Sequence, residues 1–294
     1  MARSPAQLTL ERETRVAYGR APHSLTEEPL AEMHRQMMGE QFLLRGAGDH
    51  YFHYSKGKGI TIERGPGADF SEESLWLNGS VHAAIASING MLPIHASAVA
   101  AGDQVFAFTG PGGAGKSTLV AALADRGLPM FCDDTLVLDL SDPDRISCLP
   151  GHKRLKLTPQ ALALTSATPE EKVSLTVEKF YARPAAGDVR VALPLAQLIF
   201  LDEGPQASIS AISGAERFVR IQDDHYTACL FASATQFDRI GRFAHFSRLA
   251  RQIEMARFVR PRDAIRFGEG VALVAQYVTE KAEGRSFGHK SCNR

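Results

Sequence analysis

Residues 110–117 read Gly-Pro-Gly-Gly-Ala-Gly-Lys-Ser, which is the complete phosphate-binding pattern GxxxxGK(S/T). Residues without a Cβ tolerate the torsions and close approach that turn successive backbone N–H groups inward around a phosphate. In this pattern Lys116 brings a positive charge to the β- and γ-phosphates, and the Ser117 hydroxyl is a ligand for Mg²⁺. The sequence therefore predicts a nucleoside triphosphate site formed by Gly110, Pro111, Gly112, Gly113, Ala114, Gly115, Lys116, Ser117 and Thr118.

The segments on either side of this loop support the prediction. Residues 104–109 form a short apolar run typical of a buried strand, and residues 118–124 are rich in helix formers up to a stop at Gly127. A helix that starts at the loop points the positive end of its dipole at the bound anion. The alternative, a glycine-rich turn without a ligand, leaves Lys116 and Ser117 at the helix start unexplained.

Two acids follow the next predicted strand. Residues 128–132 favour a strand that delivers Asp133 and Asp134 at its carboxyl end, the edge where the phosphate loop of a parallel sheet also lies. One carboxylate could hold Mg²⁺ through water while the other accepts a proton from an attacking hydroxyl. Because neighbouring residues on a strand face opposite ways, we expect only one of them to be central. The alternative is that the pair caps a turn or a helix.

Upstream, residues 92–100 predict a strand that forms a hairpin with the strand entering the loop, and His95 lies on it. Taken together, residues 90–140, with the ordered set of His95, phosphate loop and acid pair, resemble the kinase domain of the bacterial HPr kinase/phosphorylase family. The resemblance is closer to shorter relatives of that family, some of which look like kinases of lasso-peptide precursors.

The resemblance implies an α/β fold of the HPr kinase and phosphoenolpyruvate carboxykinase type, with a P-loop kinase core and a mixed central sheet. It implies ATP and Mg²⁺ as cofactors, and transfer of the γ-phosphoryl group to a serine of a small protein or peptide. Lys116 would hold the phosphates, Ser117 and Asp134 the metal, Asp133 would be the acid/base, and His95 would orient it. From the residues alone, a single histidine on a strand is more often structural.

Residues 151–157 alternate as a strand does, with His152, Arg154 and Lys156 on one face. This basic face could contact phosphates or an acidic peptide. Alternatively, it belongs to a solvated edge strand whose charges prevent pairing with another chain. Further downstream the family's glycine-rich signature has no copy, since residues 178–183 lack its glycines. Neither a metal-binding glutamate nor the reverse, dephosphorylating activity is therefore predicted.

Composition narrows the class of protein. The 294 residues contain 33 Lys and Arg and 33 Asp and Glu, so no global charge favours nucleic acid. The amino terminus lacks an apolar signal segment, no run is long enough to span a bilayer, and the four cysteines lack metal-ligand spacing. We expect a cytoplasmic enzyme with no nucleic-acid or membrane partner, and the resemblance suggests a homo-oligomer.

Three parts are predicted along the chain: an α+β module over residues 1–88, a catalytic domain over 89–280 and a polar tail over 281–294. The first contains strand-like segments at 41–45, 51–54 and 59–63, then a helix from residue 80. Apolar residues at helical spacing predict an amphipathic helix over 237–258.

Two other functions remain open. The first is a P-loop ATPase without a phosphoryl acceptor, although an ABC-type member should carry an LSGGQ-like segment and the sequence has none. The second is a nucleotide-binding regulatory or scaffold protein, against which the intact Lys116, Ser117, Asp133 and Asp134 argue. A carboxykinase is a further enzymatic alternative, although this chain is short for one.

Overall fold

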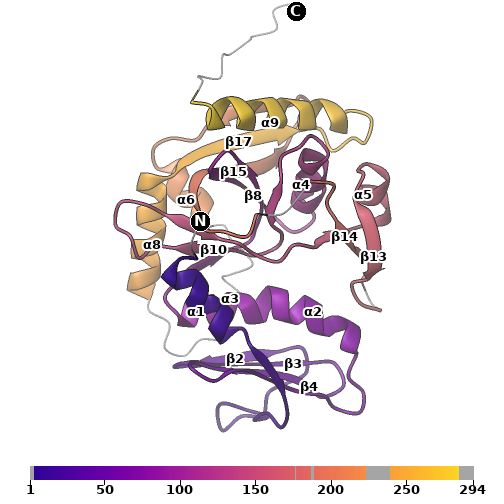
Figure 1. Cartoon of the computed structure of the whole chain (residues 1–294), viewed down its shortest axis with the longest axis vertical. Helices are drawn as coiled ribbons and strands as arrows, with labels where there is room; N and C mark the ends of the chain where they lie inside the picture. The colour runs from indigo at the N-terminus through magenta and orange to yellow at the C-terminus, as the bar shows by residue number, and fades with distance from the viewer. Residues whose placement is uncertain (1–2, 176, 187–188, 223–238, 285–294) are drawn as a thin grey trace, which may run out of the picture.

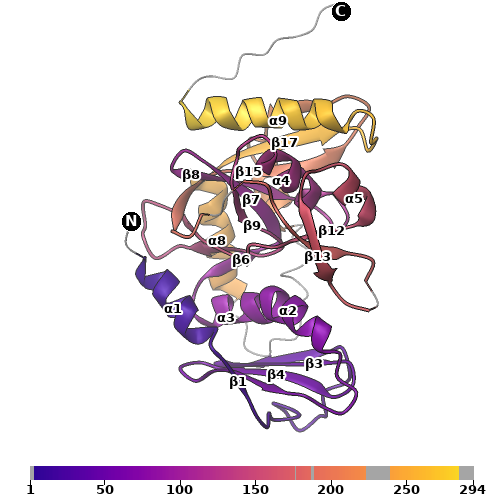
Figure 2. The same cartoon turned by 45° about the vertical axis from the view of Figure 1, so that its right-hand side comes forward.

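The computed structural model describes residues 3–175, 177–186, 189–222 and 239–284, arranged as three β-sheets with helices between and around them (Figures 1 and 2). The fold is mixed α/β. A five-stranded sheet lies at the bottom of the molecule as drawn in Figure 1, and a nine-stranded sheet forms the centre. A three-stranded sheet lies beside the central one.

The five-stranded sheet is built from the predicted strands of the first 88 residues and two more. Its order is β1 (Val16–Tyr18), β5 (Gly59–Glu63), β4 (His50–Ser55), β3 (Gln41–Gly46) and β2 (Arg35–Met38). The three strands expected at 41–45, 51–54 and 59–63 are confirmed. Helix α1 (Pro5–Glu13) precedes the sheet and begins where the Ser4 side chain accepts from the Gln7 N–H.

The helical run after this sheet begins ten residues before the predicted start at residue 80. The Asp69 side chain accepts from the Ser71 N–H and caps η1 (Phe70–Glu72), and α2 (Glu73–Trp76), the π-helical η2 (Leu77–Val81) and α3 (His82–Ile88) follow. These helices lie between the small sheet and the central one (Figure 1). Val81 and Ile85 share a core cluster with Phe52 on one side and Val137 on the other.

The central sheet runs β6-β10-β11-β15-β8-β7-β9, with β17 paired to β15 and β16 to β17. Strands β8 and β9 both pair antiparallel with β7, and β15 is parallel to β8 and to β17. The carboxyl ends of β8, β9, β15 and β17 therefore meet at one edge. The strands are β6 (Leu92–Ile94), β7 (Ala96–Ala101), β8 (Gln104–Thr109), β9 (Met130–Cys132), β10 (Leu136–Asp139), β11 (Ser147–Leu149), β15 (Leu193–Glu203), β16 (Ser208–Ala211) and β17 (Glu254–Arg260).

Helices cover both faces of the central sheet (Figure 1). On one face, α4 (Lys116–Ala124) and α9 (Phe267–Ala282) bury Leu119 and Val274 against Phe108 of β8. On the other, α6 (Glu216–Gln222) and α8 (Arg239–Gln252) bury Ile221 and Leu249. No described helix is both long enough and apolar enough to cross a bilayer.

The predicted helix over 237–258 is wrong beyond residue 252. Helix α8 ends at Gln252, and the chain then forms strand β17, which pairs in parallel with β15. Met255, Ala256 and Phe258 are buried there, and this tertiary burial overrides the helical spacing. Residues 237 and 238 lie outside the described residues.

The predicted strand over 151–157 is also shorter than expected. Only β12 (Leu155–Leu157) pairs, in the order β12, β14 (Phe180–Arg183), β13 (Thr168–Lys172). Residues 151–154 instead cross the end of β9: a Cβ on Gly151 would lie 2.8 Å from that of Cys132, and Lys153 donates to the Phe131 carbonyl. Helix α5 (Pro159–Ala163) follows, with Thr158 as its N-cap and Pro159 at its first position.

Candidate active site

The glycine-rich loop connects β8 to α4, as the sequence predicts. Gly110, Gly113 and Gly115 have φ values of 151°, 80° and 82°, a region that residues with a Cβ rarely adopt. The Leu119 N–H bonds to the Gly115 carbonyl at 2.9 Å, so the N–H groups of residues 116–118 precede the first intrahelical bond. These donors at a helix start are suited to binding an anion.

Lys116 is buried, with 6% of its surface exposed. Its ammonium group donates to the Gly110 carbonyl at 2.8 Å and to the Pro111 carbonyl at 3.2 Å. Backbone carbonyl oxygens of the loop thus hold the ammonium group. A phosphate bound to the loop would compete with these carbonyls for the ammonium group.

Asp133, which follows β9, is almost fully buried, and its carboxylate accepts three hydrogen bonds. Oδ1 accepts from the Ser97 hydroxyl at 2.5 Å and from the Ser117 hydroxyl at 2.8 Å, and Oδ2 accepts from the Lys156 backbone N–H at 3.1 Å. The carboxylate is thus fixed beside the hydroxyl that the loop motif assigns to the metal.

Asp134 lies on the cavity side and has a left-handed backbone with φ of 70°. Its carboxylate accepts from Lys156 Nζ at 2.7 Å, and His95 Nδ1 lies 3.6 Å from Oδ1 and 2.9 Å from the Asp134 backbone oxygen. Burial raises the pKa of Asp134, but Lys156, His95 and Lys116 outweigh it and leave the pKa below its usual value. Asp134 is therefore ionised at neutral pH.

One cavity of about 990 Å³ brings these residues together. Its polar lining includes His95, Ser97, Lys116, Ser117, Asp134 and Lys156. Apolar side chains also line it: Leu75, Ala161, Ala163, Leu164, Val173, Val177, Pro261, Ala264 and Phe267. Its volume is at the upper end of the usual range of ligand-binding cavities, about 300 to 1,000 Å³.

Of the three basic residues predicted on one strand face, the structure brings only Lys156 into this cavity. Arg154 pairs with Glu170 at 2.5 Å and with Glu171, and its guanidinium carbon lies 4.1 Å from the Tyr181 ring centroid. His152 lies edge-on to the same ring, and burial, with Lys156 and Arg154 nearby, lowers its pKa. Neither His152 nor Arg154 is part of the cavity lining.

Sequence reasoning missed two arginines at the carboxyl end of β17. Arg260 donates to the Ala114 carbonyl, and Arg262 donates to the Gly113 carbonyl at 3.1 Å. Both line the cavity. The sequence predicts a helix through residue 258 and therefore no strand there, so it gives no reason to expect these arginines at a strand end near the loop.

The oxygen donors of the site suit Mg²⁺. Among the described residues no group of three or more His, Cys, Asp or Glu side chains could hold a metal, and Cys132 and Cys148 are free and buried. Cys229 and Cys292 lie outside the described residues. Mg²⁺ typically keeps several waters and takes one or two protein oxygens plus substrate phosphates. The Ser117 hydroxyl beside the Asp133 carboxylate fits that requirement.

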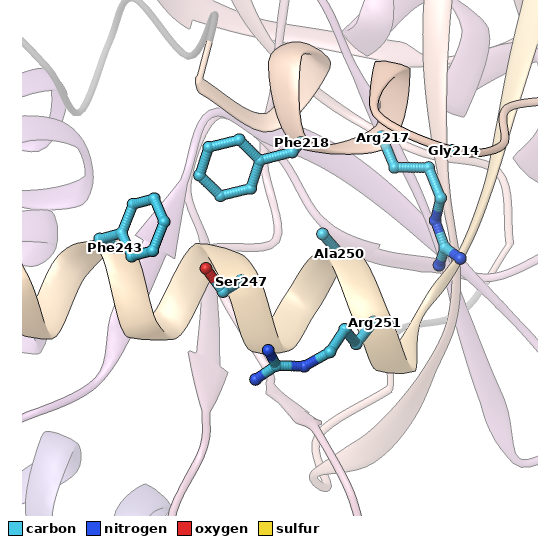
Figure 3. A pocket seen from close by; sticks show the side chains of 7 residues that line it. All are labelled: Gly214, Arg217, Phe218, Phe243, Ser247, Ala250 and Arg251. Atoms are coloured by element: carbon cyan, nitrogen blue, oxygen red, sulfur yellow. The ribbon is translucent and has the colours of Figure 1, made fainter.

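A second hollow, of about 480 Å³, lies between α6 and α8 (Figure 3). The rings of Phe218 and Phe243 meet there edge to face, with centroids 5.1 Å apart and an angle of 63° between their planes. The other residues that line it are Gly214, Arg217, Ser247, Ala250 and Arg251. No carboxylate, histidine or thiol is among these described residues, so the candidate chemistry lies in the first cavity.

The fold is mixed α/β, and one cavity is lined by the glycine-rich loop and by Asp134, with Asp133 buried next to Ser117. No family model and no curated protein matches the sequence. Among solved structures, the Hpr(Ser) kinase/phosphatase from Coxiella burnetii is a distant likeness, with 12% sequence identity and a TM-score of 0.34 over 65% of this chain and 97% of that chain.

Proposed function

We propose that this protein is an ATP- and Mg²⁺-dependent kinase that phosphorylates a serine hydroxyl of a small protein or peptide, such as a lasso-type precursor peptide. The observation that carries the proposal is that Lys116, Ser117 and Asp134 line the same cavity, which combines a glycine-rich loop with an ionised carboxylate. The resemblance of residues 90–140 supports serine as the acceptor.

The phosphate side would be formed by the loop. Lys116 would exchange its carbonyl partners for phosphate oxygens, and the Ser117 hydroxyl would turn toward the metal. Bound Mg²⁺ would offset the negative charge of the phosphates. The contacts favour Asp133 as the acid that supports the metal, because it bonds Ser117 directly, whereas the resemblance implied Asp134 for that role.

The acceptor side would then be formed by Asp134, which lines the cavity. The serine oxygen forms a bond to the γ-phosphorus while the bond from that phosphorus to the bridging oxygen of ADP breaks. The serine proton passes to Asp134, and ADP leaves with the electron pair of the broken bond. Lys156 and His95 would hold the carboxylate in place, because Lys156 donates to it and His95 Nδ1 lies 3.6 Å from Oδ1.

Incubation of the purified protein with γ-labelled ATP, Mg²⁺ and an extract of the source cell tests the proposal. Label is expected on serine of one small polypeptide, and Lys116→Ala and Asp134→Asn should abolish it. Asp139→Asn is the matched control, since Asp139 is an acid of the same sheet outside the cavity lining. Release of labelled phosphate with no labelled polypeptide would instead favour the ATPase.

A further inference from the structure

Arg260 and Arg262, at and just after the end of β17, both contact the backbone of the phosphate loop. Arg260 donates to the Ala114 carbonyl and Arg262 to the Gly113 carbonyl, and both line the cavity that contains Lys116. Three cations therefore bond to carbonyls of the same short loop, since Lys116 bonds to Gly110 and Pro111. A carbonyl is a neutral acceptor and forms a weaker bond to a cation than a phosphate oxygen does.

The two arginines differ in their charged partners. Arg262 is exposed and pairs with Glu203 at 3.1 Å. Among the described residues no carboxylate lies within ion-pair distance of Arg260, and its buried Nε–H has no hydrogen-bond partner. Burial lowers the pKa of Arg260, with Glu203 raising it and Arg262 lowering it. A partly buried guanidinium with an unused donor is costly unless an anion joins it.

Gly115 makes room for this guanidinium. A Cβ on Gly115 would lie 2.8 Å from Arg260 Nη2, closer than atoms in contact normally approach. The φ of 82° favours glycine at this position, and the absence of a Cβ lets the end of the Arg260 side chain approach the loop backbone. Arg260 therefore sits directly against the turn in which phosphates would lie.

We propose that Arg260 is a phosphate-binding residue of this site, which moves its guanidinium from the Ala114 carbonyl to the polyphosphate chain of the nucleotide. The inference rests on the proposed nucleotide site. Arg260 would bind the phosphates there together with Lys116, the N–H groups at the helix start and Mg²⁺. Arg262, whose charge is already matched by Glu203, remains a brace of the loop.

Titration calorimetry with Mg²⁺–ATP and, separately, with Mg²⁺–tripolyphosphate tests this role. Arg260→Gln is expected to weaken both ligands by about ten- to a hundred-fold, the loss of one or two hydrogen bonds to a charged group. Arg266→Gln is the matched control, because Arg266 lies in the same segment but pairs with Glu269 outside the cavity lining. It should bind both ligands as the wild type does.

The outcomes separate this inference from the proposed function. If the wild type binds both ligands and folded Arg260→Gln binds tripolyphosphate equally well, Arg260 is not a phosphate ligand. If Arg260→Gln unfolds at a lower temperature, Arg260→Lys is titrated where both are folded, and wild-type affinity in both variants overturns the proposal. A wild type that binds neither ligand overturns the proposed function itself, whatever the variants do.

Discussion

Ser117 and Asp133 are sixteen residues apart in the sequence, and the Ser117 hydroxyl donates to Asp133 Oδ1 at 2.8 Å. The hydrogen bond joins the first turn of α4 to the end of β9. Because β9 and β8 run in the same direction, the acid after one strand meets the loop after the other. The fold itself thus places a carboxylate beside the hydroxyl assigned to the metal.

Replacing Asp133 by Asn should weaken metal-dependent nucleotide binding. The amide keeps the shape of the carboxylate but removes the charge that Ser97, Ser117 and the Lys156 N–H all contact. We expect the Mg²⁺ concentration needed for half-maximal ATP binding to rise about ten-fold or more, which corresponds to about 1.4 kcal/mol or more. A Mg²⁺ titration of ATP binding measures this shift.

Asp139→Asn provides the comparison for that titration, because Asp139 caps a turn at Ser141 and lies outside the cavity lining. Its Mg²⁺ requirement should equal that of the wild type. An unchanged requirement in Asp133→Asn as well would remove Asp133 from the metal side.

Replacing Lys156 by Gln should reduce stability in a pH-dependent way. The pKa of Asp134 is lowered in the folded protein, so its pairing stabilises the fold above the unfolded pKa of about 4 and is lost as pH falls through the folded value. At pH 7 the variant should lose about 1.5 to 3 kcal/mol of the free energy of unfolding. That difference should shrink progressively below about pH 4.

Urea unfolding at a series of pH values measures this difference. Lys58→Gln is the control, since Lys58 is exposed on the small sheet's β4–β5 turn and should show no loss at any pH. A loss in Lys156→Gln that stayed constant down to pH 2 would mean that its ion pair with Asp134 contributes nothing.

Replacing Gly115 by Ala should destabilise the protein before any ligand is added. The new methyl group meets Arg260 and the backbone must keep a φ of 82°, so we expect a loss of about 1 to 3 kcal/mol. Gly112→Ala is matched to it in the same loop, because nothing lies within 4 Å of its Cβ position and its φ is not in the left-handed region. Thermal unfolding without nucleotide compares the two. Equal melting temperatures would show that neither strain nor Arg260 constrains Gly115.

Local patterns in the sequence predicted the loop, its flanking strand and helix, and the parallel strand that carries the acid pair. These features depend on residues close together in the chain. The β7–β8 hairpin was predictable for the same reason, and its register pairs Ala101 with Gln104. The domain boundaries at residues 88 and 280 remain predictions.

The remaining features depend on contacts between distant residues. Nothing in the sequence near residue 254 shows that Met255 and Phe258 will be buried against β15, so the helical spacing predicts a helix as far as residue 258 and misses the strand that ends at Arg260. Likewise, Arg154 does not share a face with Lys156 at the cavity, because it contacts Glu170 of β13 and Tyr181 of β14 instead. Strand alternation predicts which side chains share a face. Contacts with residues distant in the sequence determine whether that face lies against the core, a cavity or solvent.

The fate of the γ-phosphoryl group tests the central claim most directly. With γ-labelled ATP, Mg²⁺ and an extract of the source cell, the partition of label between inorganic phosphate and phosphoserine is measured over time. We predict that most label consumed in excess of the Lys116→Ala control appears as phosphoserine on one small polypeptide. Label that appears only as inorganic phosphate, at the same rate with and without the extract, would contradict a kinase.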